Sequence, residues 1–277
     1  MRAATVAAFA LAAAALLTAL PAQAATGRHP VITTISHRDA HRVVDGAFVI
    51  RNDVFGPVAE HETITNVNLW ANFIVTRSTA RSRTSEAWAF PDIFYGCAWN
   101  TCSPGTRLPL RVSSAMRARA TWSIRAQAGG LWNAAYDIWL MRSRHISGQA
   151  HGAEIMIWLR TSYVTPRGWR PVVRIDGTGW YFQTWRACVR PAIGTVVPAT
   201  GTVVPATGQP AGCWRYVQFR RVVPTDLVRN LPLGPFFAFA ERHRLASPRW
   251  WFTSIEAGFE IWRGGSGLAT LRFRASI

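Results

Sequence analysis

The sequence predicts an all-β domain, either a sandwich or a jelly roll, and three observations lead to this prediction. Short stretches in which apolar and polar residues alternate recur along the chain, as half-buried strands require. Gly, Pro, Ser and Asn separate these stretches at regular spacing, and a helical pattern is almost absent. Apolar residues make up 49% of the 277 residues, enough for one large core.

The N-terminus predicts export. Arg2 is followed by an apolar run over residues 3–20 and by a small-x-small cleavage site, Ala-Gln-Ala, at residues 22–24. This order is typical of a signal peptide over residues 1–24, and the run is too weakly apolar for a membrane anchor. Residues 25–46 lack clear periodicity and are predicted to be a loose leader. A single domain should therefore span residues 47–277, in a secreted protein with no membrane attachment after signal removal.

The elements of that domain follow in order. Residues 63–75 are predicted to form a strand pair, and 88–95 a strand that leads into a turn at 97–102. One helix is predicted over 234–246, where Phe236, Phe237, Phe239 and Ala240 make an apolar stripe before a basic last turn. The remaining predicted strands are 47–52, 108–113, 119–126, 134–140, 153–159, 170–175, 179–185, 214–221, 250–262 and 267–273.

Four cysteines in an exported chain predict two disulfides. Cys97 and Cys102 should bridge locally, and Cys188 and Cys213 would then close a longer loop over residues 188–213. That loop holds the heptapeptide Gly-Thr-Val-Val-Pro-Ala-Thr twice in succession, at 194–200 and 201–207. We interpret the repeat as a duplication in a surface loop, with gating of one end of a groove as the alternative. Neither cysteine spacing resembles a zinc site, and no metal is expected.

The formal net charge is +17, and all 31 basic residues are Arg. This excess invites a nucleic-acid interpretation. The arginines are dispersed rather than gathered into one stripe, so no nucleic acid is expected as a partner. An attraction to anionic polymers of the cell wall or envelope is the alternative.

Three predicted strands carry a carboxylate beside a Trp on the face away from the core. Alternation places Glu154 with Met156 and Trp158, Glu260 with Trp262, and Asp137 with Trp139. Paired carboxylates supply the acid/base and the nucleophile of glycoside hydrolysis, and aromatic rings stack on sugars. The alternatives are solvent-facing edge-strand glutamates, a strand-end aspartate and tryptophans that pack in the core.

With these residues the chain resembles glycoside hydrolase family 12, the secreted endo-β-1,4-glucanases. Four segments carry the resemblance in the family's order, over most of residues 47–275. They are Tyr-Gly-Cys-Ala-Trp-Asn-Thr-Cys-Ser-Pro-Gly-Thr at 95–106, Asn-Ala-Ala-Tyr-Asp-Ile-Trp-Leu at 133–140, Glu-Ile-Met-Ile-Trp-Leu at 154–159, and Ser-Ile-Glu-Ala-Gly-Phe-Glu-Ile-Trp at 254–262 with Gly-Ser-Gly-Leu at 265–268.

The resemblance implies a β-jelly roll of two packed curved antiparallel sheets with an open concave cleft for a β-glucan chain. It also implies a retaining mechanism, with Glu154 as nucleophile, Glu260 as acid/base and Asp137 assisting the nucleophile. The two carboxyl groups should then lie about 5–5.5 Å apart. Met156 would pack beneath the reactive sugar. Further contacts to substrate are implied for Asn52, Phe55 (where the family has Trp), Trp99, Trp139 and Trp158.

Some features depart from the family. The chain lacks the N-terminal disulfide of bacterial relatives, and the loop after Leu159 is not the usual Asn-rich version. We expect a monomer that needs no cofactor. Three alternatives stay open: a non-catalytic glucan- or cell-wall-binding protein on the same fold, a cationic envelope- or nucleic-acid-binding protein, and a xylanase of the related jelly-roll family.

Overall fold

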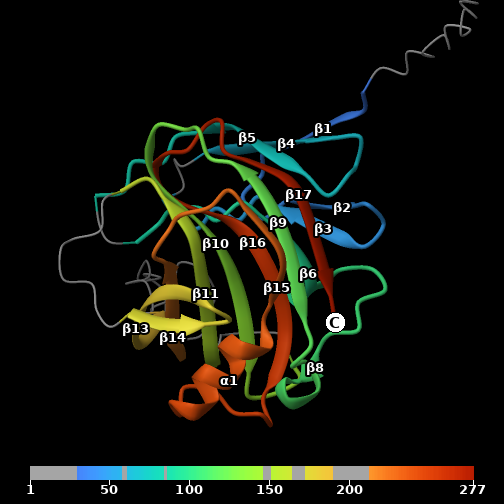
Figure 1. Cartoon of the computed structure of the whole chain (residues 1–277). Helices are drawn as coiled ribbons and strands as arrows, with labels where there is room; N and C mark the ends of the chain where they lie inside the picture. The colour runs from blue at the N-terminus through green and yellow to red at the C-terminus, as the bar shows by residue number, and fades with distance from the viewer. Residues whose placement is uncertain (1–29, 58–60, 84–85, 146–150, 164–171, 190–211) are drawn as a thin grey trace, which may run out of the picture. The chain divides into compact units, whose positions relative to one another are not determined.

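Two packed β-sheets carry the fold, as the alternation predicts (Figure 1). The structure, a computed structural model, describes residues 30–277 apart from 58–60, 84–85, 146–150, 164–171 and 190–211. Residues 31–277 form one compact unit, to which everything below refers. The expected signal peptide and both copies of the heptapeptide lie outside the described residues. Within the described part of the chain, no helix has the length and apolar character needed to span a bilayer.

The smaller sheet has six strands in the order β1-β4-β5-β17-β9-β15, all paired antiparallel. Strand β9 lies next to the edge strand β15, between it and the C-terminal strand β17 (Figure 1). Its strands are β1 (Ile32–Ile35), β4 (Glu62–Val67), β5 (Phe73–Ser78), β9 (Arg119–Arg125), β15 (Leu227–Pro232) and β17 (Ala269–Ser276).

The larger sheet has eleven strands, nine of them in the order β12-β13-β14-β11-β10-β16-β6-β3-β2, with β7 on β6 and β8 on β16. Every pair is antiparallel except β11 with β14, which run parallel. Its strands are β2 (His41–Val44), β3 (Phe48–Arg51), β6 (Asp92–Ala98), β7 (Thr101–Cys102), β8 (Leu110–Arg111), β10 (Gly130–Met141), β11 (Gly152–Thr161), β12 (Val172–Ile175), β13 (Thr178–Val189), β14 (Gly212–Arg221) and β16 (Trp251–Gly264). A 3-10 turn, Val112–Ser114, follows β8.

The core lies between the sheets and follows the predicted alternation. Ile155, Ile157 and Leu159 of β11 are buried there, on the face opposite Glu154. Trp122 of the smaller sheet packs its ring against Tyr136 and Phe259 of the larger one, with centroids 5.3 and 5.7 Å away. Removing each such side chain from water contributes about 1.5–3 kcal/mol. This packing fixes which face of β10, β11 and β16 turns outward.

The predicted helix is present as α1, Gly234–Arg242, and is shorter than the predicted 234–246. Its aromatic stripe packs on β13 and β14. The ring centroids of Phe236 and Phe219 are 5.1 Å apart, and those of Phe239 and Phe182 are 4.9 Å apart. Arg244 takes a positive φ of 58°, and the Leu245 N–H returns to the Ala240 carbonyl at 2.8 Å. That left-handed residue ends the helix before its predicted last turn.

The prediction of a loose leader over 25–46 is wrong for residues 32–35 and 41–44. These residues form β1, paired with β4, and β2, paired with β3. Both are edge strands and most of their residues are exposed or half-buried, so their sequence carries too few apolar positions to alternate clearly. The same reason explains why β15, the other edge of the smaller sheet, was not predicted.

The structure pairs the cysteines as expected. Cys97 bonds to Cys102 across the β6–β7 turn. Cys188 bonds to Cys213 across the antiparallel pair β13–β14, where the two residues are direct register partners. The second disulfide therefore closes the chain on both sides of residues 190–211.

Candidate active site

Strand register brings the predicted catalytic carboxylates to one face of three neighbouring strands. On β10, Asp137 lies opposite Met156 of β11 and opposite Glu256 of β16. Trp139 lies opposite Glu154, and Asn133 lies opposite Glu260. We call this outward side of β10, β11 and β16, with its neighbours on β14, β6 and β3, the carboxylate face.

The carboxylate face concentrates acid in a basic protein. Six of the chain's 14 acidic residues lie on it or beside it. They are Asp53, Asp92, Asp137, Glu154, Glu256 and Glu260. Since buried carboxylates are costly unless paired or protonated, this clustering in a chain of net charge +17 points to chemistry rather than to solubility.

Glu154 is a buried carboxylate with an ordered donor. Only 7% of its surface is exposed, and the Trp214 indole N–H donates a hydrogen bond to Oε2. Burial raises the pKa of Glu154 well above its ordinary value, the Trp214 bond opposes this rise, and the charges of Glu260 and Glu256 add to it. The bond orients one carboxylate oxygen and leaves the other for a reacting atom.

Glu260 is half-buried on β16. The Asn133 side-chain amide on β10 donates a hydrogen bond to its Oε2. Burial raises the pKa of Glu260 to about 7, and the Asn133 bond opposes the rise. A carboxyl group with this pKa holds its proton near neutral pH and can act as a general acid.

Asp137 lies between the other carboxylates. Its Oδ2 accepts a hydrogen bond from the Trp139 indole N–H at 3.1 Å, and its Oδ1 is buried with no hydrogen-bond partner among the described residues. Burial, and then the charges of Glu154, Glu256 and Glu260, raise the pKa of Asp137 well above its ordinary value. The mutual repulsion of these carboxylates disfavours ionisation of all of them at once.

A buried ionic network adjoins these carboxylates, and the sequence did not predict it. The Arg51 guanidinium donates from Nη2 to Asp92 at 2.5 Å and to Glu256 at 2.7 Å, and it lies 3.3 Å from Asp53. The Ser254 hydroxyl donates to the other oxygen of Glu256 at 2.7 Å. Period-two alternation puts Glu256 on the same face of β16 as Glu260, but nothing in the sequence connects it to Arg51, 205 residues away.

The predicted aromatic residues divide between two clusters. Trp158, Trp262 and Tyr163 contact one another edge-on, with centroids 6.1 to 6.4 Å apart. Trp139 lies between Trp99 and Trp214, at 5.4 and 5.7 Å. Met156, 1% exposed, lies beside Asp137 in the register.

Asn52 and Phe55 are not brought together with the carboxylates by any described contact. Asn52 is fully buried, and its amide donates to the backbone carbonyls of His37 and Glu62 at 3.1 and 2.9 Å. Phe55 is 53% exposed beyond the end of β3. Their roles in sugar contact stay predictions.

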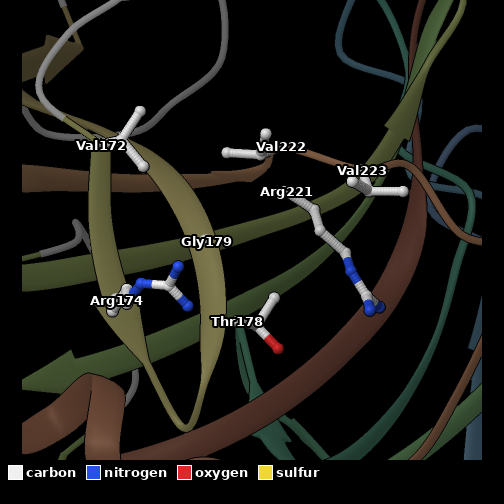
Figure 2. A pocket seen from close by; sticks show the side chains of 7 residues that line it. All are labelled: Val172, Arg174, Thr178, Gly179, Arg221, Val222 and Val223. Carbon is white, nitrogen blue, oxygen red and sulfur yellow. The ribbon is translucent and has the colours of Figure 1, made fainter.

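A hollow of about 400 Å³ lies elsewhere, at the β12–β13 hairpin and the end of β14 (Figure 2). Figure 2 shows Val172 and Val222 on one side of it, with Arg174 and Arg221 below. None of its lining residues is a carboxylate, so it is not the site of the predicted chemistry. The described residues also contain no group of three or more His, Cys, Asp or Glu that could hold a metal ion.

Asp137→Asn is expected to stabilise the protein more at pH 8 than at pH 4. The raised pKa of Asp137 means that the folded state favours the protonated form, so its contribution is complete below the ordinary Asp pKa and is lost as pH rises through the raised value. Asn imitates the neutral carboxyl group and does not titrate. Melting temperatures of wild type and variant at pH 4, 6 and 8 test this.

The control is Asp176→Asn, which changes an exposed aspartate in the β12–β13 turn. Its difference from wild type should not vary with pH in this way. Parallel curves for Asp137→Asn and wild type would show that folding does not raise the pKa of Asp137.

The chain is similar in sequence and in fold to known proteins. A family model for glycosyl hydrolase family 12 matches residues 48–277. A metagenome-derived family 12 endoglucanase is 30% identical in sequence to this chain and superposes on it with a TM-score of 0.73. The match spans 89% of this chain and 97% of the endoglucanase. The endoglucanase cel12A from Rhodothermus marinus is also 30% identical, with a TM-score of 0.72; the match spans 88% of this chain and 98% of cel12A. A Bacillus licheniformis family 12 xyloglucanase, at 23% identity, 88% and 99% coverage and a TM-score of 0.70, shares the fold. No curated protein sequence matches.

Proposed function

The chain belongs to glycosyl hydrolase family 12 and is a glycoside hydrolase, and from this premise we propose that it is a secreted, retaining endo-β-1,4-glucanase. The single observation that carries the proposal is the pair Glu154 and Glu260 on one sheet face, each held by a different donor, Trp214 and Asn133. Two carboxyl groups of unequal surroundings are what double displacement needs.

The first step breaks the glycosidic bond. Glu260 donates its proton to the glycosidic oxygen, while the Glu154 carboxylate attacks the anomeric carbon and forms a glycosyl ester. The leaving chain departs with a new hydroxyl group. Asp137, protonated and with a free Oδ1, assists by stabilising the ionised Glu154 before attack and by orienting it.

The second step returns the enzyme to its starting state. Glu260, now a carboxylate, removes a proton from a water molecule whose oxygen attacks the same anomeric carbon. The ester bond to Glu154 breaks, and the sugar leaves with the configuration it had in the polymer. In the first step Glu260 supplies the proton and Glu154 the attacking electron pair. In the second step water supplies both, and Glu260 takes up the proton, so the proposed mechanism requires no cofactor.

The proposed substrate is a β-1,4-linked glucan such as cellulose, mixed-linkage glucan or xyloglucan. Support comes from relatives described as endoglucanases at 30% identity and from the buried aromatic clusters on the carboxylate face. Phe55 offers a smaller ring than the Trp of the family, so stacking there should be weaker. Export is supported by the N-terminal segment and by two disulfides, which persist in oxidising compartments.

Release of reducing ends from barley β-glucan, cellulose, xyloglucan and xylan tests the proposal. We expect release from at least one of the three glucans and far less from xylan. Release from xylan alone would favour the related xylanase family. A folded wild type that releases nothing from any of the four would favour the alternative of a glucan- or cell-wall-binding protein without turnover.

A further inference from the structure

Three exposed arginines converge on two half-buried tryptophans where β8, the end of β10 and the start of β16 meet. The Arg111 guanidinium lies 3.9 Å from the centroid of the Trp251 ring, and that of Arg144 lies 5.6 Å from the same ring. Arg142 lies 5.5 Å from the Trp250 ring. We call these five residues the arginine–tryptophan cluster.

The segments of the cluster supply no acid of their own. The segments that form it, residues 110–114, 141–145 and 247–252, contain no Asp or Glu. Arg111, Arg142 and Arg144 form no ion pair with an acidic side chain of the described residues. Three like charges held by two adjacent rings repel one another, and a bound anion would relieve that repulsion.

The chemistry of the cluster fits an acidic sugar. A guanidinium group matches the two oxygens of a carboxylate, and a partly exposed indole offers an apolar surface to a sugar ring. A uronic acid residue presents both groups together. A polyphosphate or nucleic acid would need the same positive charge but not the sugar-carboxylate combination.

Trp251, with Arg111 and Arg144 over its ring, also continues the carboxylate face. Trp251 lies opposite Met141 in the β10–β16 register, and Met141 packs with Trp139, whose indole N–H bonds to Asp137. A polysaccharide that lies along this face therefore reaches the cluster without leaving the sheet.

We propose that the arginine–tryptophan cluster binds carboxylate-bearing polysaccharides, polymers of uronic acids in particular. Binding itself does not depend on the proposed glucanase activity. Its consequence does rest on that activity: where an acidic glycan lies beside the neutral substrate, the cluster would hold the enzyme there.

Titration of the full chain with polygalacturonate at low and moderate salt tests the site. The variant Arg111→Ser/Arg142→Ser/Arg144→Ser removes three charges from the cluster. It is expected to raise Kd at least about tenfold, because each arginine loses a charge-assisted contact. It should also flatten the salt dependence of Kd.

The matched control removes three other exposed arginines, Arg125, Arg272 and Arg274, from the outer face of β9 and β17. Net charge falls by the same amount, and Kd should change less than about threefold because screened charges distant from the ligand contribute little. If both triple variants bind polygalacturonate equally weakly, net charge alone explains the affinity and the proposed site is overturned. A wild type that does not bind polygalacturonate overturns it as well.

A second polymer separates the ligand classes. Single-stranded DNA is titrated in the same way. If the wild type binds it more tightly than polygalacturonate, and the cluster variant loses this binding while the control variant keeps it, the uronic-acid assignment is overturned in favour of nucleic acid. Melting curves establish that each variant is folded, and barley β-glucan hydrolysis should be equal in wild type and both triple variants. Absence of hydrolysis with intact polygalacturonate binding would contradict the glucanase proposal and leave the cluster standing.

Discussion

Glu154→Ala is expected to lower kcat on β-glucan by at least about 10⁴-fold, because removal of a covalent nucleophile leaves only binding and acid catalysis. Azide should restore part of the turnover of an activated aryl β-glucoside substrate. The small anion fits where the carboxylate was and attacks the anomeric carbon from the same side. The product should be the glycosyl azide of inverted configuration, because only one displacement has then occurred.

Azide rescue separates Glu154 from its neighbours. Asp137→Ala should not give an inverted azide, since Asp137 is proposed to act through Glu154 and not on the sugar. The matched control is Glu241→Ala on α1, a glutamate outside the carboxylate face, which should keep wild-type turnover. An inverted azide from Glu260→Ala in place of Glu154→Ala would exchange the two roles.

The interior strands were predictable because enclosure on both faces leaves them rich in apolar residues, with the few polar ones confined to one face. Ile155, Ile157 and Leu159 face the core, while Glu154, Met156 and Trp158 are nearly as buried on the other side. Edge strands lack that constraint. In β2, only Val44 of four residues is buried, so no pattern marks it as a strand.

The same distinction holds for the site. Glu154, Glu260 and Asp137 could be placed on outward faces from period-two alternation within their own segments. The partner of Asp137 lies within its own strand, at Trp139, but the partners of Glu154 and Glu260 could not be predicted because both pairings depend on strand order. Asn133 meets Glu260 across 127 residues, and Trp214 meets Glu154 through the parallel neighbour β14. Composition gave one further indication. The chain has only 14 acidic residues, so a carboxylate inside an apolar strand indicates a functional role.

The activity that Glu260→Ala loses should depend on whether the leaving group of the substrate needs a proton. On β-glucan, whose leaving sugar hydroxyl needs a proton, kcat/KM is expected to fall by about 10²–10⁴-fold, the usual contribution of a general acid. On a dinitrophenyl β-cellobioside, whose leaving group departs without a proton, the first step should be nearly unaffected. Equal losses on both substrates would contradict the assignment of Glu260 as the acid.

The pH dependence tests the same proton from another side. The pKa of Glu260 is raised by burial to about 7, and the group must be protonated for the first step, so kcat/KM of wild type should fall as pH rises through about 7. Asn133 stabilises the ionised form by its hydrogen bond. Asn133→Ala should therefore raise the pKa of Glu260 and move the alkaline limb of the profile to higher pH. If the alkaline limb stays at the same pH in Asn133→Ala, a group other than Glu260 loses its proton at that pH, and Glu260 is not the acid.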